Sequence, residues 1–380
     1  MQIHVVQSDD SLFKLGRHYG VDYKIIAKEN EIDPGKTLVI GQTIVISEAK
    51  PTPKIGVIET NGYAYVNIPD DVLEKTLPHL TYISLFSYEA LETGELKPIQ
   101  AEGESRVLSQ AVAARVIPVL VLTNLGKGGN FDPQLASTIL SSEASVSKLL
   151  DNLVAIMHQK GYNGLDVDFE FVFPSDKTAY ESFLGKAATR LHNEGFFISC
   201  AIPAKEAPEA TSPFAGAYDY ATIGNIVDNV TLMTYEWGYA SSEPMAVAPI
   251  DAVERVSRFA ASQMPSSKIL MGIPNYGYDW PTPFKPGNIG KTTGIVQAVE
   301  TARSRSQDIR FDEQAQTPWF QYFENTKQGR EVWFEDARSA KAKLSLAARH
   351  NLGGFSYWNI NRFWPQSWLV QESMYDVAKS

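Results

Sequence analysis

Three carboxylates at alternate positions stand out as groups that could do chemistry together. Asp166, Asp168 and Glu170 lie in the stretch NGLDVDFEFV, where apolar residues fill the intervening positions. Side chains alternate across a strand with period two, so the three acids share one face. Apolar residues before and after the stretch argue against an exposed edge strand. Acids in a mostly buried setting repel one another and lose hydration, which is costly unless they are used.

The spacing of the acids suggests which of them carries a proton. Residues two apart on a strand are roughly 6.5–7 Å apart at Cα, so neighbouring carboxyl groups can touch. Burial and like-charge repulsion then raise one pKa and leave a protonated acid near neutral pH. Glu170 is nearest the carboxyl end of the strand, and we predict that it is the proton donor.

Because the three acids lie on one strand, only some reaction types are open to them. Glycoside hydrolysis usually places two carboxylates on opposite sides of the bond, which one strand cannot readily provide. A substrate with a 2-acetamido group removes this requirement, because its carbonyl oxygen attacks the anomeric carbon and forms an oxazolinium ion. The protein then supplies an acid, a carboxylate for the acetamide N–H and a donor for its oxygen. The main alternative for these acids is a hard-metal site for a cation such as Mg²⁺.

Other catalytic patterns are missing from the sequence. The six histidines are scattered, and there is no H-E-x-x-H, phosphate loop or nucleophile elbow. We therefore predict no cofactor and no resident metal.

Eight apolar runs in residues 56–380 alternate with helical patterns and must position the acids. The runs are KIGVIE with GYAYVNI, LTYISLFSYEA, IPVLVLTNL, YNGLDVDFEFV, FFISCAIP, VDNVTLMTYEW, KILMGIPNYGYDW and LGGFSYWNI. This alternation favours a (β/α)8 TIM barrel over a doubly wound sheet, with active-site residues at the carboxyl ends of the strands. A bare barrel needs ~250 residues. The excess indicates a small α+β insertion between the seventh and eighth strands, at about residues 281–340.

A separate small unit is predicted at residues 1–48, followed by a linker at 49–55. IHVVQ and TIVI are typical of strands, and Ser11 and Asp22 are positioned to cap two helices between them. Pro51 and Pro53 indicate a short, stiff linker. The unit is expected to be a βααβ module.

This unit resembles the LysM family, which binds N-acetylglucosamine-containing glycans such as peptidoglycan and chitin. The matching features are D-S-L, Asn30 and the V-x-G-Q-x-I-x-I ending, although Asp9 replaces a usual glycine. The alternative is a generic βααβ spacer. The resemblance implies glycan-binding residues in two loops, at Asp10, Ser11, Leu12, Ile32, Asp33 and Pro34.

The larger region resembles glycoside hydrolase family 18. N-G-L-D-V-D-F-E is similar to that family's D-G-x-D-x-D-x-E signature on the fourth strand, with Asn163 in place of the first aspartate. The resemblance implies that Glu170 is the acid/base, that Asp168 orients the acetamide and that Asp166 tunes Asp168. It also implies a donor to the acetamide oxygen at Tyr235, within MTYEWG.

Further substrate-binding residues follow from three motifs of that family. MTYEWG is similar to M-x-Y-D, with glutamate in place of the usual aspartate, GIPNYGYDW to G-x-P-x-Y-G, and FSYWNI to the stretch that carries a tryptophan under the −1 sugar. For Trp237 a core role remains an open alternative. The residues implied are Met233, Glu236, Trp237, Asn275, Tyr276, Tyr278 and Trp358.

Composition restricts the partners. A net charge of −10 and a pI near 5.2 argue against nucleic acid or an anionic membrane. The start, MQIHVVQSDDSL, lacks a secretory pattern, and no run of 18 apolar residues suggests a membrane span. Cys200 is the only cysteine and is expected to be a small buried apolar residue.

The combined features resemble the spore cortex-lytic glycosylases of spore-forming bacteria. They imply a retaining, substrate-assisted N-acetylglucosaminidase that acts on peptidoglycan of the spore cortex or its fragments. They also imply an enzyme that is made without a signal peptide and is associated with the spore coat or cortex, or otherwise with the cell wall. The alternatives are a chitinase and a glycan-binding lectin on an inactive barrel, although Glu170 argues against the lectin.

Overall fold

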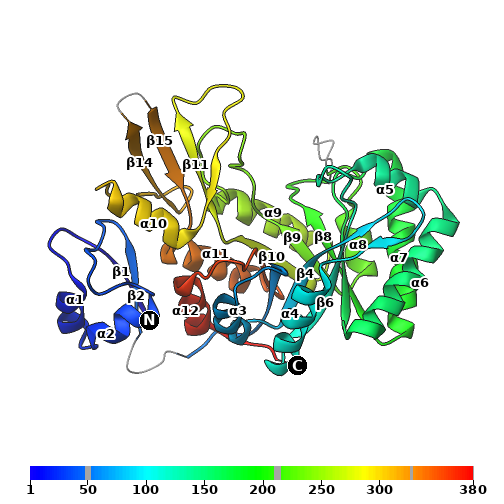
Figure 1. The fold of residues 1–380 in the computed structure, drawn as a ribbon, viewed down its shortest axis with the longest axis horizontal. Helices are drawn as coiled ribbons and strands as arrows, with labels where there is room; N and C mark the ends of the chain where they lie inside the picture. Colours follow the sequence, from blue (N-terminus) through cyan, green and yellow to red (C-terminus); the bar gives the residue numbers. More distant parts are fainter. Residues whose placement is uncertain (48–52, 209–214, 326–327, 380) are drawn as a thin grey trace.

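The computed structural model describes residues 1–47, 53–208, 215–325 and 328–379 (Figure 1). Residues 49–52 of the predicted linker lie outside the described residues. Two bodies of unequal size are visible: a small N-terminal module at the lower left of Figure 1, and a much larger α/β domain.

The N-terminal module has the predicted βααβ order. Its elements are β1 (Gln2–Val5), α1 (Leu12–Tyr19), α2 (Tyr23–Glu29) and β2 (Thr43–Ile46). The two strands pair antiparallel, from Gln2 opposite Ile46 to Val5 opposite Thr43. Ser11 and Asp22 cap the two helices through their side-chain oxygens, as predicted. A small apolar core joins the helices to the strands.

The larger domain is a closed barrel of eight parallel strands, which confirms the predicted fold. Its strands are β3 (Gly56–Tyr65), β4 (Tyr82–Ala90), β6 (Ile117–Thr123), β7 (Gly164–Asp168), β8 (Phe197–Pro203), β9 (Asn229–Met233), β10 (Ile269–Pro274) and β16 (Gly354–Trp358). The barrel closes because β3 pairs with both β4 and β16. The carboxyl ends of all eight strands therefore meet at one mouth.

Helices surround the barrel and supply the outer half of its core. They are α3 (Asp70–Thr76), α4 (Ala101–Ala113), α5 (Pro133–Leu140), α6 (Glu143–Lys160), α7 (Lys177–Asn193), α8 (Tyr220–Ile226), α9 (Ile250–Gln263), α11 (Ala337–His350) and α12 (Pro365–Met374). Short elements complete the domain: β5 (Leu96–Lys97), β17 (Tyr375–Val377), η1 (Leu77–His79), η2 (Pro174–Asp176) and η3 (Ser266–Lys268). Cys200 is fully buried beside the hydroxyl of Tyr180, as expected.

A five-stranded antiparallel sheet with one helix is inserted between β10 and β16. It contains β11 (Gly277–Thr282), β12 (Lys291–Thr293), α10 (Ile295–Ser304), β13 (Arg310–Asp312), β14 (Thr317–Asn325) and β15 (Gln328–Trp333). The run KILMGIPNYGYDW, expected as one strand, is therefore divided between the barrel and this sheet. Gly277 permits the division, because a Cβ there would lie 2.2 Å from the carbonyl oxygen of Trp333.

The N-terminal module packs directly against the larger domain. The backbone N–H of Ile309 donates to the carbonyl oxygen of Ile40 at 2.9 Å, and the guanidinium of Arg303 donates to that of Thr37 at 2.8 Å. Gln366 on α12 donates to the carbonyl oxygen of Thr43 at 2.6 Å. Val39 of the module is buried in the same apolar cluster as the barrel core. Figure 1 accordingly shows the module against α10, α11 and α12.

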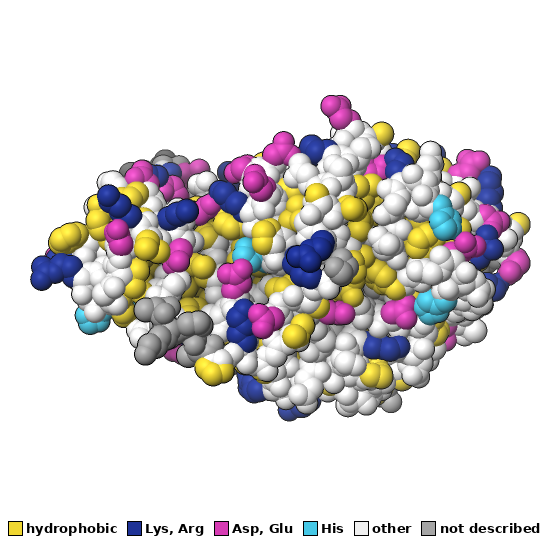
Figure 2. Space-filling model, turned by 90° about the horizontal axis from the view of Figure 1, so that it is seen from below, with side chains coloured by type: hydrophobic (Ala, Val, Ile, Leu, Met, Phe, Trp, Pro, Cys, Tyr) yellow, Lys and Arg dark blue, Asp and Glu magenta, His cyan; other side chains and the backbone are white. Residues whose placement is uncertain are grey.

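The surface carries both signs of charge. On the face shown in Figure 2, acidic and basic side chains are interspersed between apolar patches. The net charge of −10 is thus not gathered into one acidic field on this face.

Candidate active site

The strand β7 places the acids as the alternation predicted. Leu165, Val167 and Phe169 are completely buried, and the ring of Phe169 stacks on Phe183 of α7. Asp166 and Asp168 are almost fully buried on the other face, inside the barrel. β7 ends at Asp168, so Glu170 lies just beyond the strand rather than at its last position.

The backbone of Glu170 is held by one buried side chain that the sequence did not single out. The amide of Asn124 accepts from the N–H of Glu170 at 2.9 Å and donates to its carbonyl oxygen at 3.0 Å. The next residue, Phe171, has a positive φ of 57°. The chain therefore turns sharply after Glu170, while Asn124 fixes the position of its Cα.

Asp166 is the deepest of the three acids and is fully hydrogen-bonded. Tyr63 on β3 donates to one carboxylate oxygen and Ser199 on β8 donates to the other, each at 2.6 Å. Burial raises the pKa of Asp166, and these two bonds act in the opposite direction. Because both carboxylate oxygens are bound to these side chains and the group is almost fully buried, its influence on the site is indirect.

Asp168 and Glu170 form an interacting pair. One oxygen of Asp168, Oδ1, is buried and has no hydrogen-bond partner among the described residues. Burial raises the pKa of Asp168 well above its ordinary value, and the charges of Glu170 and Asp166 add to this. Burial, followed by the charge of Glu236, raises the pKa of Glu170 to about 7. Glu170 therefore keeps its proton up to near neutral pH, and the buried Oδ1 of Asp168 is available as an acceptor.

The end of β9 contributes the groups opposite the acids. Tyr235 is partly buried, and burial together with the charges of Asp168 and Glu170 raises the pKa of its hydroxyl. Its ring fits only because residue 272 on β10 is glycine, where a Cβ would lie 2.7 Å from the ring. Met233, the last residue of β9, is partly exposed at the mouth. A neutral phenol thus faces the carboxylates.

Glu236 is held by two tyrosines of the insertion. The hydroxyl of Tyr276 donates to Glu236 Oε1, and the hydroxyl of Tyr278 lies 3.0 Å from the same oxygen. Partial removal from water raises the pKa of Glu236, while both hydrogen bonds lower it. The glutamate present here instead of aspartate is therefore oriented, with its charge felt by Glu170.

Trp358 ends β16 among other aromatic rings. Tyr63, Tyr65 and Phe86 contact it edge to face, with ring centroids 5.4, 6.1 and 5.0 Å away. Its carbonyl oxygen accepts from the backbone N–H of Asn275 at 2.9 Å. The Asn275 amide also donates to the carbonyl oxygens of Asn359 and Arg362, at 2.9 and 2.7 Å. Asn275 therefore fixes the loop that follows Trp358.

A cavity of about 370 Å³ opens beside these residues. Its lining contains five predicted substrate-binding residues: Glu236, Asn275, Tyr276, Tyr278 and Trp358. It also contains residues that the sequence did not indicate: Tyr65, Asn67, Thr292, Asn359, Asn361 and Arg362. Trp237 does not line it and packs against the barrel core instead. The cavity has the aromatic and amide lining typical of a sugar-binding site.

Family comparisons match this arrangement. Residues 62–362 match the family model of the glycosyl hydrolases family 18, and residues 4–47 match the LysM domain. The chain belongs to glycosyl hydrolases family 18.

Relatives of this family 18 chain cover its full length. It is 36% identical to the cortical fragment-lytic enzyme of Bacillus cereus, over 100% of the chain and 99% of that protein. The crystal structure of the spore cortex-lytic enzyme SleL of Bacillus cereus is similar with a TM-score of 0.94 and 32% identity, covering 100% of this chain and 98% of that one. A chitinase of Chromobacterium violaceum shares the fold, with a TM-score of 0.77 and 23% identity, covering 83% of this chain and 98% of its own.

The LysM module of this family 18 chain has a groove of its own. Asp10, Ser11, Leu12 and Pro34 line a cavity of about 600 Å³ between its two loops. Of the other two predicted residues, Ile32 packs on the module core, and the carboxylate of Asp33 accepts from the N–H of Gly35. Phe13, Tyr23 and Lys36 line the groove without having been predicted.

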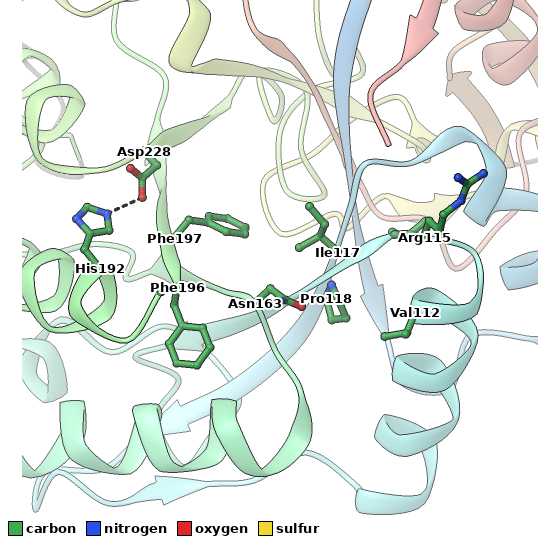
Figure 3. Close-up of a pocket in the computed structure, with 11 residues that line it drawn as sticks. Val112, Arg115, Ile117, Pro118, Asn163, His192, Phe196, Phe197 and Asp228 are labelled. Atoms are coloured by element: carbon green, nitrogen blue, oxygen red, sulfur yellow. Dashed lines mark hydrogen bonds and ion pairs between the residues drawn. The ribbon is translucent and has the colours of Figure 1, made fainter. Parts of the chain in front are cut away.

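Two further observations concern the rest of the molecule. A cavity of about 490 Å³ lies at the amino ends of the strands, where Asn163, Phe197 and the ion pair between His192 and Asp228 surround it (Figure 3). In a TIM barrel this end serves stability, so the cavity is not the active site. Among the described residues, no group of His, Cys, Asp or Glu is placed to hold a metal ion, and no helix is long and apolar enough to cross a membrane.

Proposed function

We propose that this family 18 enzyme hydrolyses N-acetylglucosaminyl bonds of spore cortex peptidoglycan by substrate-assisted catalysis with retention. The observation that carries the proposal is the Asp168–Glu170 pair: a carboxyl group held protonated near neutral pH beside a buried carboxylate oxygen that lacks a partner. This is what a 2-acetamido substrate needs from the protein.

The first step uses each group once. Glu170 donates its proton to the oxygen of the leaving sugar while the acetamido carbonyl oxygen attacks the anomeric carbon. Asp168 Oδ1 accepts a hydrogen bond from the acetamide N–H and stabilises the positive charge of the oxazolinium ion. Tyr235 donates to the acetamide oxygen. Asp166, held by Tyr63 and Ser199, adds to the negative surroundings that raise the pKa of Asp168.

The second step reverses the proton transfer. The Glu170 carboxylate accepts a proton from a water molecule that attacks the anomeric carbon and opens the oxazolinium ring. Two displacements at one carbon give net retention, so the first product is the β anomer. Trp358 supports the sugar from below, and Glu236, Tyr276 and Tyr278 bind its hydroxyl groups.

Cortex peptidoglycan is the substrate that the relatives favour. The proteins with the highest identity given above are named for cortex fragments or the spore cortex, and they align over the whole chain. The LysM groove is suited to N-acetylglucosamine-containing glycans and would hold the enzyme on the wall. We place the enzyme in the spore on the same grounds. A chitinase would use the same chemistry on an unbranched polymer.

The test compares wild type with Glu170→Gln on purified cortex fragments and on chitin oligomers. We expect hydrolysis to fall at least roughly 10²–10⁴-fold, the worth of general acid–base catalysis, while the thermal transition is retained. Nuclear magnetic resonance should show the β anomer first, and activity should persist in excess chelator. Wild-type turnover by the variant contradicts the role of Glu170. Loss of activity with chelator that Mg²⁺ restores favours the metal alternative, and activity on chitin alone favours the chitinase.

A further inference from the structure

A second and larger cavity lies at the same mouth of the barrel. Its volume is about 1110 Å³, about three times that of the cavity beside Trp358. One wall is the hairpin between β4 and β5, and the other is the loop that follows β6 together with the start of α5. We call it the leaving-group cleft. Its lining is Glu89, Leu91, Glu92, Thr93, Glu95, Lys97, Leu125, Gly126, Lys127, Gly128, Asn130, Phe131, Asp132, Pro133 and Leu135.

The loop wall of the leaving-group cleft is attached to Glu170. Phe131 contacts Phe171, the residue after Glu170, with ring centroids 6.3 Å apart. Asn124, which binds the backbone of Glu170, also donates to the carbonyl oxygen of Asp132 at 3.0 Å. The cleft and the catalytic acid are therefore neighbours through two independent contacts.

The hairpin wall lies at the same height along the barrel axis as Asp168. Glu89 on β4 is opposite Thr123 on β6, and Thr123 is opposite Asp168 on β7. The cavity beside Trp358 lies on the other side, where Glu236 acts on Glu170. Glu170 is thus linked to both cavities, to the leaving-group cleft through Asn124 and Phe171 and to the cavity beside Trp358 through the charge of Glu236.

Some charged side chains of the leaving-group cleft form ion pairs, whereas others pair with no described residue. Glu89 pairs with Lys97 at 2.8 Å, and Glu95 pairs with Lys148 on α6 at 2.9 Å. The side chains of Lys127, on the loop wall, and Glu92, on the hairpin wall, are exposed and have no bond to another described residue. One ammonium and one carboxylate thus remain available on facing walls, beside the apolar surface of Phe131 and Leu91.

We propose that this cleft binds the peptide-bearing muramyl residue on the leaving side of the cleaved bond. The inference rests on the proposed function, in which Glu170 protonates the leaving oxygen and the released sugar lies beyond it. In peptidoglycan that sugar carries a lactyl group and, through it, a peptide with carboxylates and the amine of a diamino acid. Lys127 faces a peptide carboxylate and Glu92 faces the amine. Chitin carries neither group, so the cleft selects between the two polymers.

The experiment measures a ratio of kcat/KM values in the full-length enzyme. The substrates are muropeptide oligosaccharides with intact peptides, the same oligosaccharides after removal of the peptides by an amidase, and chitin oligomers. We expect Lys127→Gln and Glu92→Gln each to lower the ratio of peptide-bearing to peptide-free substrate about fivefold, the upper scale of one exposed ion pair. The matched control is Lys186→Gln, which removes an exposed charge that pairs with Glu143; neither residue lines the cleft, so the ratio should be kept.

Each other outcome overturns the inference. Equal losses on all three substrates mean that the residues support the fold or the sugar chain only. An unchanged ratio means that no peptide occupies the cleft. Wild-type enzyme that cleaves chitin oligomers but no muramyl substrate contradicts the proposed function, whereas wild type that cleaves all three with variants of unchanged ratio contradicts the cleft alone.

Discussion

Asp166, Asp168 and Glu170, spaced two residues apart, have three different environments. Asp166 receives hydrogen bonds on both oxygens, Asp168 keeps one buried oxygen without a described partner, and Glu170 lies past the strand end beside the charge of Glu236. Three carboxylic acids can thus have different roles because their neighbours differ. The alternation predicted that these acids share a face, and their partners decide what each can do.

We expect Glu236 to tune the proposed acid, Glu170, and the pH profile of kcat/KM tests this. Its negative charge helps to raise the pKa of Glu170 to about 7, so Glu170 remains protonated at higher pH than an ordinary glutamate. Glu236→Gln removes that charge and lowers the pKa of Glu170. The proton donor is then lost at lower pH, and the alkaline limb of kcat/KM moves to lower pH.

The control for this prediction is Glu243→Gln, an exposed acid in the loop that follows β9. It changes the net charge equally and should leave the alkaline limb in place. If Glu236→Gln lowers the rate at every pH but does not shift the alkaline limb, Glu236 binds the sugar and does not set the pKa of Glu170.

At the scale of elements, the loop after β16 is held by one side chain, that of Asn275, which directly follows β10. Asn275→Ala removes the donor to the carbonyl oxygens of Asn359 and Arg362, at a cost of about 1–3 kcal/mol for buried groups that lose a partner. The loop should loosen and Trp358 should lose its fixed position, which lowers kcat/KM on every N-acetylglucosamine substrate. Calorimetry and kinetics on the same preparations measure both effects.

Two variants separate this role from direct sugar binding. Asn275 Oδ1 has no described partner and could accept from a sugar. Asn275→Asp keeps acceptors but loses the donor, so we expect it to be as impaired as Asn275→Ala. Asn229→Ala, which loses the hydrogen bond that its side-chain amide donates to Glu59 at the opposite end of the barrel, should keep kcat/KM. Full activity of Asn275→Asp would assign Asn275 to the substrate.

Sequence patterns predicted what depends on near neighbours in the chain. The alternation of β7, the two helix caps of the small module and the eight strand–helix units are all of this kind. Tyr63 and Asn124 could not be found in this way, because their partners lie 103 and 46 positions away along the chain. The division of KILMGIPNYGYDW also depends on a distant contact, between Gly277 and Trp333.

The whole molecule behaves as one packed unit rather than a barrel with a tethered module. Prolines near residue 50 indicated a short, stiff linker, whose residues 49–52 lie outside the described residues. The LysM module itself contacts α10, α11 and α12, and its Val39 and Val45 join the apolar core of the barrel. The groove of the LysM module is therefore held at a fixed place relative to the candidate active site. These contacts join residues about 300 positions apart, so local patterns do not show them.

Gly41 tests this packing in the full-length chain. Its φ is 81°, and a Cβ there would lie 1.8 Å from the carbonyl oxygen of Ile309 in the insertion. Gly41→Ala must push the module away from the insertion, at a cost of about 1–3 kcal/mol for overpacking. Calorimetry should show a lower transition temperature or a separate transition for the module. The groove itself is not touched, because Gly41 is not part of its lining.

Gly20→Ala is the matched control for Gly41→Ala. Gly20 has a similar φ of 69°, and a Cβ there meets nothing within 4 Å. It therefore costs only the left-handed backbone conformation of an alanine, about 1–2 kcal/mol, without a steric clash. We expect Gly41→Ala to be the more destabilising of the two and to alter unfolding of the barrel, whereas Gly20→Ala affects the module alone. Equal destabilisation by both, with an unchanged barrel transition, would mean that the module and the barrel unfold independently. The contacts between the module and the barrel would then be too weak to hold the groove in a fixed place.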